Sequence, residues 1–342
     1  MQRETSRSLF ATASIVLVLC LASGTALAQS YQVTKLVSNV KGASHTDPQL
    51  VNGWGIAYGP GAPFWVSDAG TGLSTLYDGT GVKQSLVVTI PTASGSGTGS
   101  PTGIVYNGSA EFQIDTWTSA FLFATLDGTI SGWSHFVPNK ALKAVDNSGS
   151  HTSYTGLAIT KKKTGNLIFA ADNANNKVDV YDGTFKFVTS FTDKTVPAGF
   201  SVFGVQDIGG KVYVSYAATN GGAGGFIEIF KENGVFVKRF AQGAPLNQPW
   251  GFAVAPAKFG PLGGTLLIAN NTPASTISGF NPTTGALVGT MKDTSGKTIK
   301  IDQLWGIEFG GGSAANGAKN QLFFAAGPKN FAVGLFGVIN FK

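Results

Sequence analysis

The amino-acid sequence predicts an all-β fold, a single six-bladed β-propeller with four-stranded blades, and two observations support this. A three-residue motif, an aromatic residue or threonine followed by glycine and an apolar residue, recurs six times, with its glycines 48, 53, 48, 47 and 55 residues apart. A period near 50 residues that contains only strand patterns is typical of propeller blades. The 47 glycines and 12% charged residues suit many short, buried strands joined by tight turns. The motifs are Trp54-Gly55-Ile56, Thr102-Gly103-Ile104, Thr155-Gly156-Leu157, Phe203-Gly204-Val205, Trp250-Gly251-Phe252 and Trp305-Gly306-Ile307.

Each motif is followed by a second strand pattern that is almost entirely apolar. These runs occupy residues 64–66, 121–123, 167–169, 212–214, 266–268 and 322–324. A strand that is apolar on both faces needs cover on both faces, and a blade receives it from its two neighbours in the ring. A third strand pattern follows, and turns such as Asp182-Gly183 then lead to an outer strand, which makes four strands per copy.

The sixth copy ends with its third strand, residues 334–340, and so lacks an outer strand. Residues 31–37, which precede the first motif, have the length and pattern of a spare strand. We expect this N-terminal strand to complete the last blade and close the ring, because closure removes two exposed sheet edges.

Residues 1–28 have the pattern of a secretory signal peptide. Arg3 and Arg7 precede an apolar run, residues 9–22, and Ala26-Leu27-Ala28 offers small residues for cleavage. Cleavage leaves residues 29–342 as the propeller, in the periplasm or secreted, with no membrane span. The alternatives are an uncleaved anchor, although the run is shorter than the roughly 20 residues of a membrane span, and a lipoprotein attached through Cys20, the only cysteine.

Two recurring features have structural interpretations. The repeated glycine falls in the innermost strand, where blades crowd toward the axis and a side chain would obstruct their close approach. Trp54, Trp250 and Trp305 beside it are expected to be core residues rather than ligand platforms.

A ring of neutral polar residues is the first candidate site. In a four-stranded blade, the loop before the first strand and the loop between the second and third strands emerge on the same face. Six hydrogen-bonding residues lie three positions before the repeated glycines and are expected to surround one mouth of the channel as ligand-binding residues: Asn52, Ser100, Ser153, Ser201, Gln248 and Gln303.

Carboxylates on the same loops are the second candidate site. Asp47 and Asp302 precede first strands, whereas Asp68 and Asp172 follow second strands. Oxygen ligands that converge on a pore could bind a hard cation such as Ca²⁺. The alternative is that these residues bond their own loop backbone in Asx turns.

The remaining polar residues give few functional signals. After cleavage, 22 basic and 17 acidic residues leave a net charge of +5 that is thinly spread. The run Lys161-Lys162-Lys163 is interpreted as a solvated hairpin turn, and no nucleic-acid partner is expected. The three histidines, His45, His135 and His151, form no helical zinc pair and flank no nucleophile motif.

Longer segments carry a resemblance to a known family. They are residues 47–55, 67–79, 127–133, 197–200, 247–251 and 301–306. The sequence resembles an uncharacterised family of exported bacterial propeller proteins, some of which carry a PEP-CTERM sorting tail; residues 337–342 here lack that motif. Residues 171–181 also resemble an NHL repeat. The resemblance implies the fold and export, but no catalytic residues.

Three functions are compatible with the sequence. The first is a monomeric, non-catalytic module that binds a small molecule, glycan or protein partner at the channel mouth. The second is a metal-dependent enzyme of the lactonase or lyase kind that uses Asp47, Asp68, Asp172 or Asp302. The third is an architectural component of the cell envelope whose flat face binds other proteins. A fold alone does not establish which of these functions applies.

Overall fold

The computed structural model of the chain describes residue 1 and residues 30–342. Residues 2–29, which hold all but the first residue of the predicted signal peptide, lie outside the described residues together with Cys20. Among the described residues, no helix has the length and apolar character required to cross a membrane.

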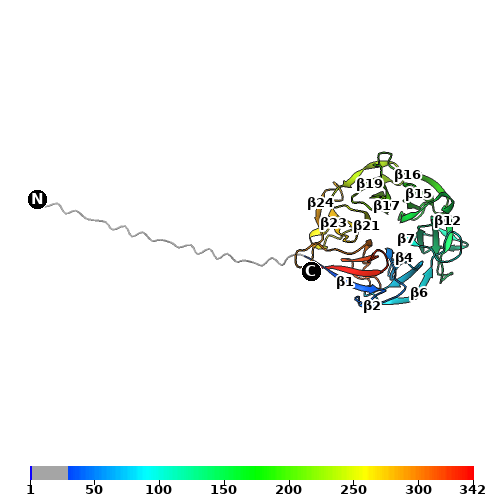
Figure 1. Cartoon of the computed structure of the whole chain (residues 1–342), viewed down its shortest axis with the longest axis horizontal. Helices are drawn as coiled ribbons and strands as arrows, with labels where there is room; N and C mark the ends of the chain where they lie inside the picture. Colours follow the sequence, from blue (N-terminus) through cyan, green and yellow to red (C-terminus); the bar gives the residue numbers. More distant parts are fainter. Residues whose placement is uncertain (2–29) are drawn as a thin grey trace.

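Within residues 30–342, six large antiparallel sheets surround a central axis (Figure 1). Blades 1 to 3 each have four strands, given from the axis outward: β3 (Gly53–Ala57), β4 (Phe64–Asp68), β5 (Leu73–Tyr77) and β6 (Lys83–Thr89) in blade 1; β7 (Pro101–Tyr106), β10 (Phe121–Thr125), β11 (Thr129–Trp133) and β12 (Leu142–Asp146) in blade 2; β13 (Tyr154–Ile159), β14 (Leu167–Asp172), β15 (Lys177–Asp182) and β16 (Phe187–Phe191) in blade 3.

Blades 4 and 5 repeat this order: β17 (Phe200–Asp207), β18 (Lys211–Ala218), β19 (Gly225–Lys231) and β20 (Phe236–Gln242); then β21 (Pro249–Val254), β22 (Leu266–Asn270), β23 (Ile277–Phe280) and β24 (Leu287–Thr290). Blade 6 has β25 (Leu304–Phe309), β26 (Gln321–Ala326) and β27 (Leu335–Phe341). A hairpin of β8 (Gln113–Ile114) and β9 (Trp117–Thr118) and two short 3₁₀ helices, η1 (Ser148–Ser150) and η2 (Gly260–Leu262), lie in loops. The predicted all-β, six-bladed propeller is confirmed.

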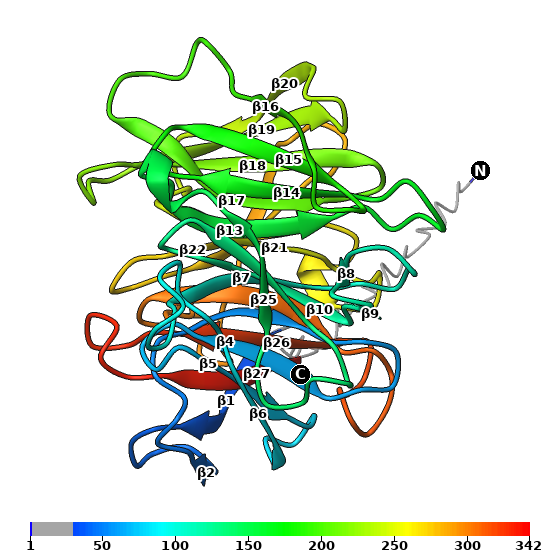
Figure 2. The same cartoon turned by 90° about the vertical axis from the view of Figure 1, so that its right-hand side faces the viewer.

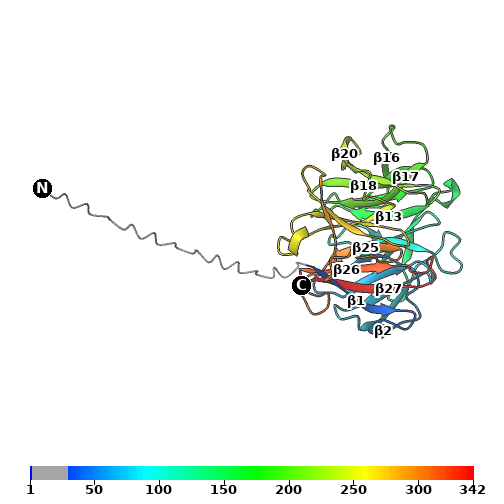
Figure 3. The ribbon, with the colours of Figure 1, turned by 60° about the vertical axis from the view of Figure 1, so that its left-hand side comes forward.

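The N-terminal strand closes the ring, as predicted. β1 (Tyr31–Ser38) pairs antiparallel with β27, from Tyr31 opposite Phe341 to Ser38 opposite Leu335, and supplies the fourth strand of blade 6 (Figure 3). A fifth strand, β2 (His45–Thr46), adds to β1 in parallel and was not predicted. The two ends of the described propeller therefore belong to one sheet.

The apolar core is divided into layers between blades, which lie face to face when the ring is seen from the side (Figure 2). Trp65 of blade 1 and Phe123 of blade 2 belong to one buried cluster. Six such clusters among the described residues each join two adjacent blades, including blades 6 and 1. Burial on both faces explains why the second strands lack the alternation of an ordinary antiparallel strand.

The repeated glycines mark the contacts between innermost strands. A Cβ atom on Gly103 would lie 2.2 Å from the backbone nitrogen of Leu157, on the next blade. A Cβ atom on Gly306 would lie 2.9 Å from the carbonyl oxygen of Trp54, so the innermost strands of blades 6 and 1 make the same close contact where the ring closes. Gly55, Gly156, Gly204 and Gly251 face the next innermost strand in the same way. The structural interpretation of the repeated glycine is confirmed.

Candidate functional site

The central channel has two mouths, which we name by the direction of the innermost strands. At the strand-start mouth, the beginning of each innermost strand pairs with the end of the second strand, as in Gly53 opposite Asp68 and Pro249 opposite Asn270. The predicted ring residues and the predicted carboxylates therefore do emerge at the same end of their blades. The strand-end mouth lies at the other end of the channel.

Aromatic side chains fill the channel near the strand-start mouth. The rings of Trp54 and Trp305 stack with their centroids 3.5 Å apart, and Trp250 meets both edge-on. Phe203 and Phe331 pack against this cluster. Trp54 and Trp305 are only 5% and 2% exposed, which agrees with their expected role as core residues. Their ring contacts bring side chains of blades 1, 5 and 6 together at this end of the channel.

Several predicted ring residues already have protein partners. Asn52 accepts a hydrogen bond from the Trp305 indole at 3.0 Å, and Ser201 donates to the carbonyl oxygen of Asn173 at 2.5 Å. The Gln248 amide donates to the carbonyl oxygen of Gly222 at 2.5 Å. Ser100, Ser153 and Gln303 also lie at this mouth, next to β7, β13 and β25. Ligand binding by the ring stays a prediction.

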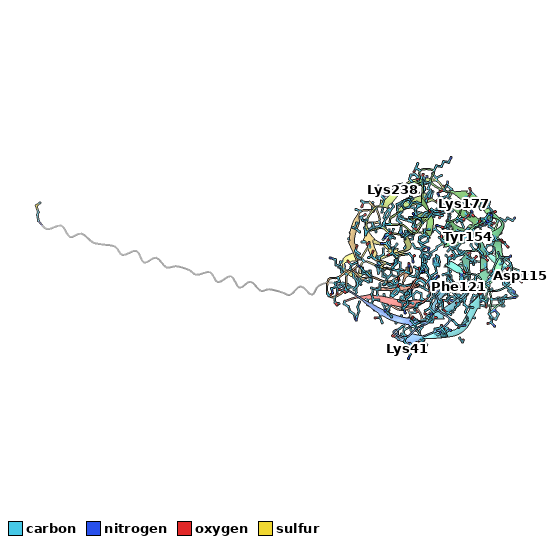
Figure 4. All side chains as sticks on the ribbon, in the orientation of Figure 1. Lys41, Asp115, Phe121, Tyr154, Lys177 and Lys238 are labelled. Atoms are coloured by element: carbon cyan, nitrogen blue, oxygen red, sulfur yellow. The ribbon has the colours of Figure 1, made fainter. Side chains whose placement is uncertain are left out.

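The four predicted metal ligands lie in three different blades. Asp47 accepts hydrogen bonds from Tyr77 at 2.7 Å and Lys83 at 2.9 Å, and these bonds outweigh burial and lower its pKa. Asp172 lies 3.7 Å from Lys177, which Figure 4 labels in blade 3 beside Tyr154. Asp302 accepts a bond from the Lys329 backbone at 2.8 Å.

Asp68, the fourth predicted ligand, is fully buried. Burial raises its pKa well above the usual range, and neither carboxyl oxygen has a hydrogen-bond partner among the described residues. Within residues 30–342, no three His, Cys, Asp or Glu side chains are grouped closely enough to hold a metal ion. Metal binding by the predicted carboxylates stays a prediction.

The strand-end mouth is hollowed. A hollow of about 580 Å³ lies where the innermost strands end, and we call it the acidic hollow because three carboxyl side chains line it. Glu308 and Phe309 come from the end of β25, and Gln206 and Asp207 from the end of β17. Lys161 and Tyr58 follow β13 and β3. Gln206, Phe252 and Glu308 also line the narrow channel, so the hollow opens onto it.

A second hollow of about 480 Å³ adjoins the first, and we call it the basic hollow. Its walls include Tyr106, Asn166 and the run Lys161, Lys162 and Lys163. Both hollows share Tyr58, Lys161, Lys162 and Glu308. Because they share these residues, the two hollows adjoin, and we call the pair the depression. Lys161–Lys163 are exposed, as expected for a solvated turn, and also line this depression.

The polar side chains of the acidic hollow have few protein partners. Among the residues the structure describes, Oδ2 of Asp207 is buried without a hydrogen-bond partner. Burial raises the pKa of Glu308 to about 7, with Lys161 opposing the effect, and it also raises the pKa of Asp207. Burial, reinforced by the Glu308 charge, raises the pKa of Tyr58 to about 12. Unpaired groups with shifted pKa values in a concave site are typical of binding or catalytic sites.

Glu308 is expected to make the stability of the protein depend on pH. Its pKa is higher in the folded chain, about 7, than its ordinary 4.5, so folding favours the protonated form. The contribution of Glu308 to the free energy of unfolding should therefore fall as pH rises from about 4.5 to 7. Glu308→Gln should remove this loss and stabilise the protein on the order of 2 kcal/mol at pH 8 but hardly at pH 4. Urea unfolding at both pH values measures the difference.

Glu111 provides a control of opposite sign. Burial opposes ionisation there, but hydrogen bonds from the backbone of Asn166 and Gly165 outweigh it and lower the pKa. Glu111→Gln should therefore destabilise the protein more at pH 8 than at pH 3. If Glu308→Gln changed the free energy of unfolding equally at all pH values, the raised pKa assigned to Glu308 would be wrong.

Sequence reasoning missed this mouth, although one signal was present. The residue two positions after the repeated glycine is apolar in four copies, namely Ala57, Val105, Ala158 and Ala253. It is polar only in the fourth and sixth copies, Gln206 and Glu308. Gln206 and Glu308 are therefore recognisable in the sequence as polar residues at a position that is apolar in the other innermost strands.

The fold and this mouth define the protein as a six-bladed propeller with an open depression at one end of its channel. Comparison with known proteins identifies relatives. The chain is 31% identical over 333 residues to the uncharacterized protein R648 of Acanthamoeba polyphaga mimivirus, a match that covers 91% of this chain and 80% of that protein. It belongs to the same family. The uncharacterized mimivirus protein L690 is 29% identical over 301 residues, 81% of this chain and 78% of its own length. No family model matches the chain.

Solved structures share the fold. A gluconolactonase from Xanthomonas campestris matches with a TM-score of 0.56 at 13% identity and covers 86% of this chain and 87% of its own. A glucose dehydrogenase matches at 0.55 with 10% identity, 90% of this chain and 98% of its own. A streptogramin B lyase matches at 0.50 with 13% identity, 93% of this chain and 99% of its own. At these identities the likeness concerns the fold alone.

Proposed function

We propose that the protein is an exported binding module that holds a small polar organic molecule at the strand-end mouth of the propeller. The observation that carries the proposal is the acidic hollow itself: about 580 Å³, with the side chains of Glu308, Lys161 and Tyr58 making no hydrogen bond to any described residue. A volume of this size suits a small ligand, and a few convergent polar groups orient it. The predicted signal peptide supports export.

A metal-dependent enzyme is the alternative, because lactonase and lyase propellers share the fold. The carboxylates expected to hold the cation are spread over blades 1, 3 and 6. Melting curves with calcium chloride and with a chelator test this alternative directly, since a structural or catalytic cation raises the melting temperature and its removal lowers it.

A blocking variant tests the proposed site. Val254 lines the acidic hollow and is 53% exposed, so Val254→Trp should fill space in the hollow at little cost to the core. The mature chain is first screened by thermal shift against a library of small polar molecules, because a ligand at 100 times its Kd adds about 2.7 kcal/mol to stability. Calorimetry of the hits should show binding at least about tenfold weaker in the variant, a loss of about 1.4 kcal/mol.

Val188→Trp is the matched control, because Val188 is 52% exposed but lies on the outer strand β16 of blade 3. The Val188→Trp variant should bind every hit with the affinity of the wild type. Hits that bind Val254→Trp normally, or a screen without hits, would count against the strand-end mouth as the binding site.

A further inference from the structure

Resting on the proposed function, we infer that the ligand is a zwitterion that lies along both hollows. Its ammonium group faces Asp207 and Glu308 in the acidic hollow, and its carboxylate group faces Lys161 and Lys163 in the basic hollow. The connecting part of the ligand crosses Tyr58, which lines both hollows.

The charges of the two hollows have opposite excess. Lys162 forms an ion pair with Glu232, so these two charges offset each other. The acidic hollow then keeps Asp207 and Glu308 against Lys161. The basic hollow keeps Lys161 and Lys163 against Glu308. The depression as a whole therefore has a negative end and a positive end.

Within residues 30–342, no ion pair offsets the charges at the two ends. Among the described residues, Lys161, Lys163 and Glu308 form no ion pair, and the seven ion pairs found involve other side chains. Oδ2 of Asp207 is buried and has no hydrogen-bond partner. A partly buried charge without a partner is unfavourable, and a ligand of complementary charge would relieve this cost. Burial also raises the pKa values of Glu308 and Asp207, and Lys161 only partly opposes this effect.

The lining between the two ends accepts an apolar linker. Tyr58 borders both hollows, Phe252 borders the acidic hollow, and Tyr106 borders the basic hollow. A ligand with only a negative charge would meet Asp207 and Glu308 unfavourably, and one with only a positive charge would meet Lys161 and Lys163. A molecule with both charges, separated by a short carbon chain, satisfies both ends.

ω-Amino acids of increasing length provide the probe. Calorimetry of the mature protein is performed with 4-aminobutanoate, 6-aminohexanoate, 8-aminooctanoate and 12-aminododecanoate, and with hexylamine and hexanoate as single-charge controls. We expect one chain length to bind best, and at least about tenfold tighter than either control, because two charge-assisted contacts then form at once. Hexylamine or hexanoate binding as tightly as the best ω-amino acid would overturn the inference.

Two charge variants test the acidic end and the basic end of the depression separately. Asp207→Asn should weaken binding of the best ω-amino acid and of hexylamine but not that of hexanoate, which loses a repulsive charge. Lys163→Gln should weaken the ω-amino acid and hexanoate but not hexylamine, for the same reason. Asp115→Asn and Lys41→Gln are controls at exposed rim positions, far from the axis in Figure 4, and should change nothing. If both hollow variants weaken all three probes equally, the assignment of the two ends is wrong.

The outcome distinguishes this inference from the function on which it rests. If molecules of the library bind and Val254→Trp abolishes their binding, but no ω-amino acid binds, the zwitterion is wrong and the binding module stands. If nothing binds at the strand-end mouth, both fail.

Discussion

A chain that begins at His45 is expected to lose its stable monomeric fold, because it lacks β1. β1 supplies seven residue pairs to β27 and buries Tyr31, Leu36 and Val37. The Tyr31 hydroxyl also donates to the carbonyl oxygen of Phe259 and accepts a hydrogen bond from the backbone of Leu262, at 2.9 and 3.0 Å, which links blade 6 to blade 5. Three buried apolar side chains at about 1.5–3 kcal/mol each approach the 5–15 kcal/mol that typically stabilises a domain.

Circular dichroism melts and sedimentation measure this effect, with a chain that begins at Ser30 as the folded control. The shortened chain also exposes the edge of β27, which favours association. A synthetic peptide of residues 30–44 added to the shortened chain should restore the melting transition, because it can pair with that edge. A shortened chain that remains folded and monomeric would show that the ring needs no closure by β1.

The second large effect is expected at the axis, where Gly103→Ala should cost about 3 kcal/mol or more. The new Cβ would lie 2.2 Å from the Leu157 nitrogen and 2.8 Å from the Gly156 carbonyl carbon. These are backbone atoms of a neighbouring innermost strand, so relief requires the blades to move apart. Urea unfolding of the variant and of the wild type measures the difference in free energy.

Gly149→Ala is the matched control. Gly149 lies in η1, and a Cβ there would meet no atom within 4 Å. This variant should unfold within about 0.5 kcal/mol of the wild type, as surface substitutions usually do. If Gly103→Ala were equally neutral, the spacing between blades 2 and 3 would be set by contacts other than the glycine.

The fold was predictable because its determinants recur along the chain. Each copy carries its own glycine and its own apolar second strand, and the pattern therefore counts the blades. Closure of the ring was also predictable. The last copy lacked an outer strand, and the segment before the first copy, which contains Tyr31 and Val37, was unassigned. These signals are local in sequence and need no knowledge of how side chains meet in space.

The depression at the strand-end mouth, where we propose binding, was not predictable in the same way. Both mouths of a propeller are formed by loops, and spacing alone pointed to the ring from Asn52 to Gln303, whose ligand binding stays a prediction. The position of the depression depends on which mouth the aromatic side chains occupy. Trp54, Trp250 and Trp305 are separated by whole blades in the sequence, and only the closed ring brings them into contact.

Sequence alone therefore determined the number of blades, the closure by β1 and the role of the repeated glycine, since each depends on a pattern repeated or completed along the chain. Only the tertiary structure decided that the strand-start mouth is filled by tryptophans and that Lys161, Asp207 and Glu308 share the other mouth. The physical reason is that packing around the axis depends on side chains from different blades, whose meeting is a property of the ring geometry.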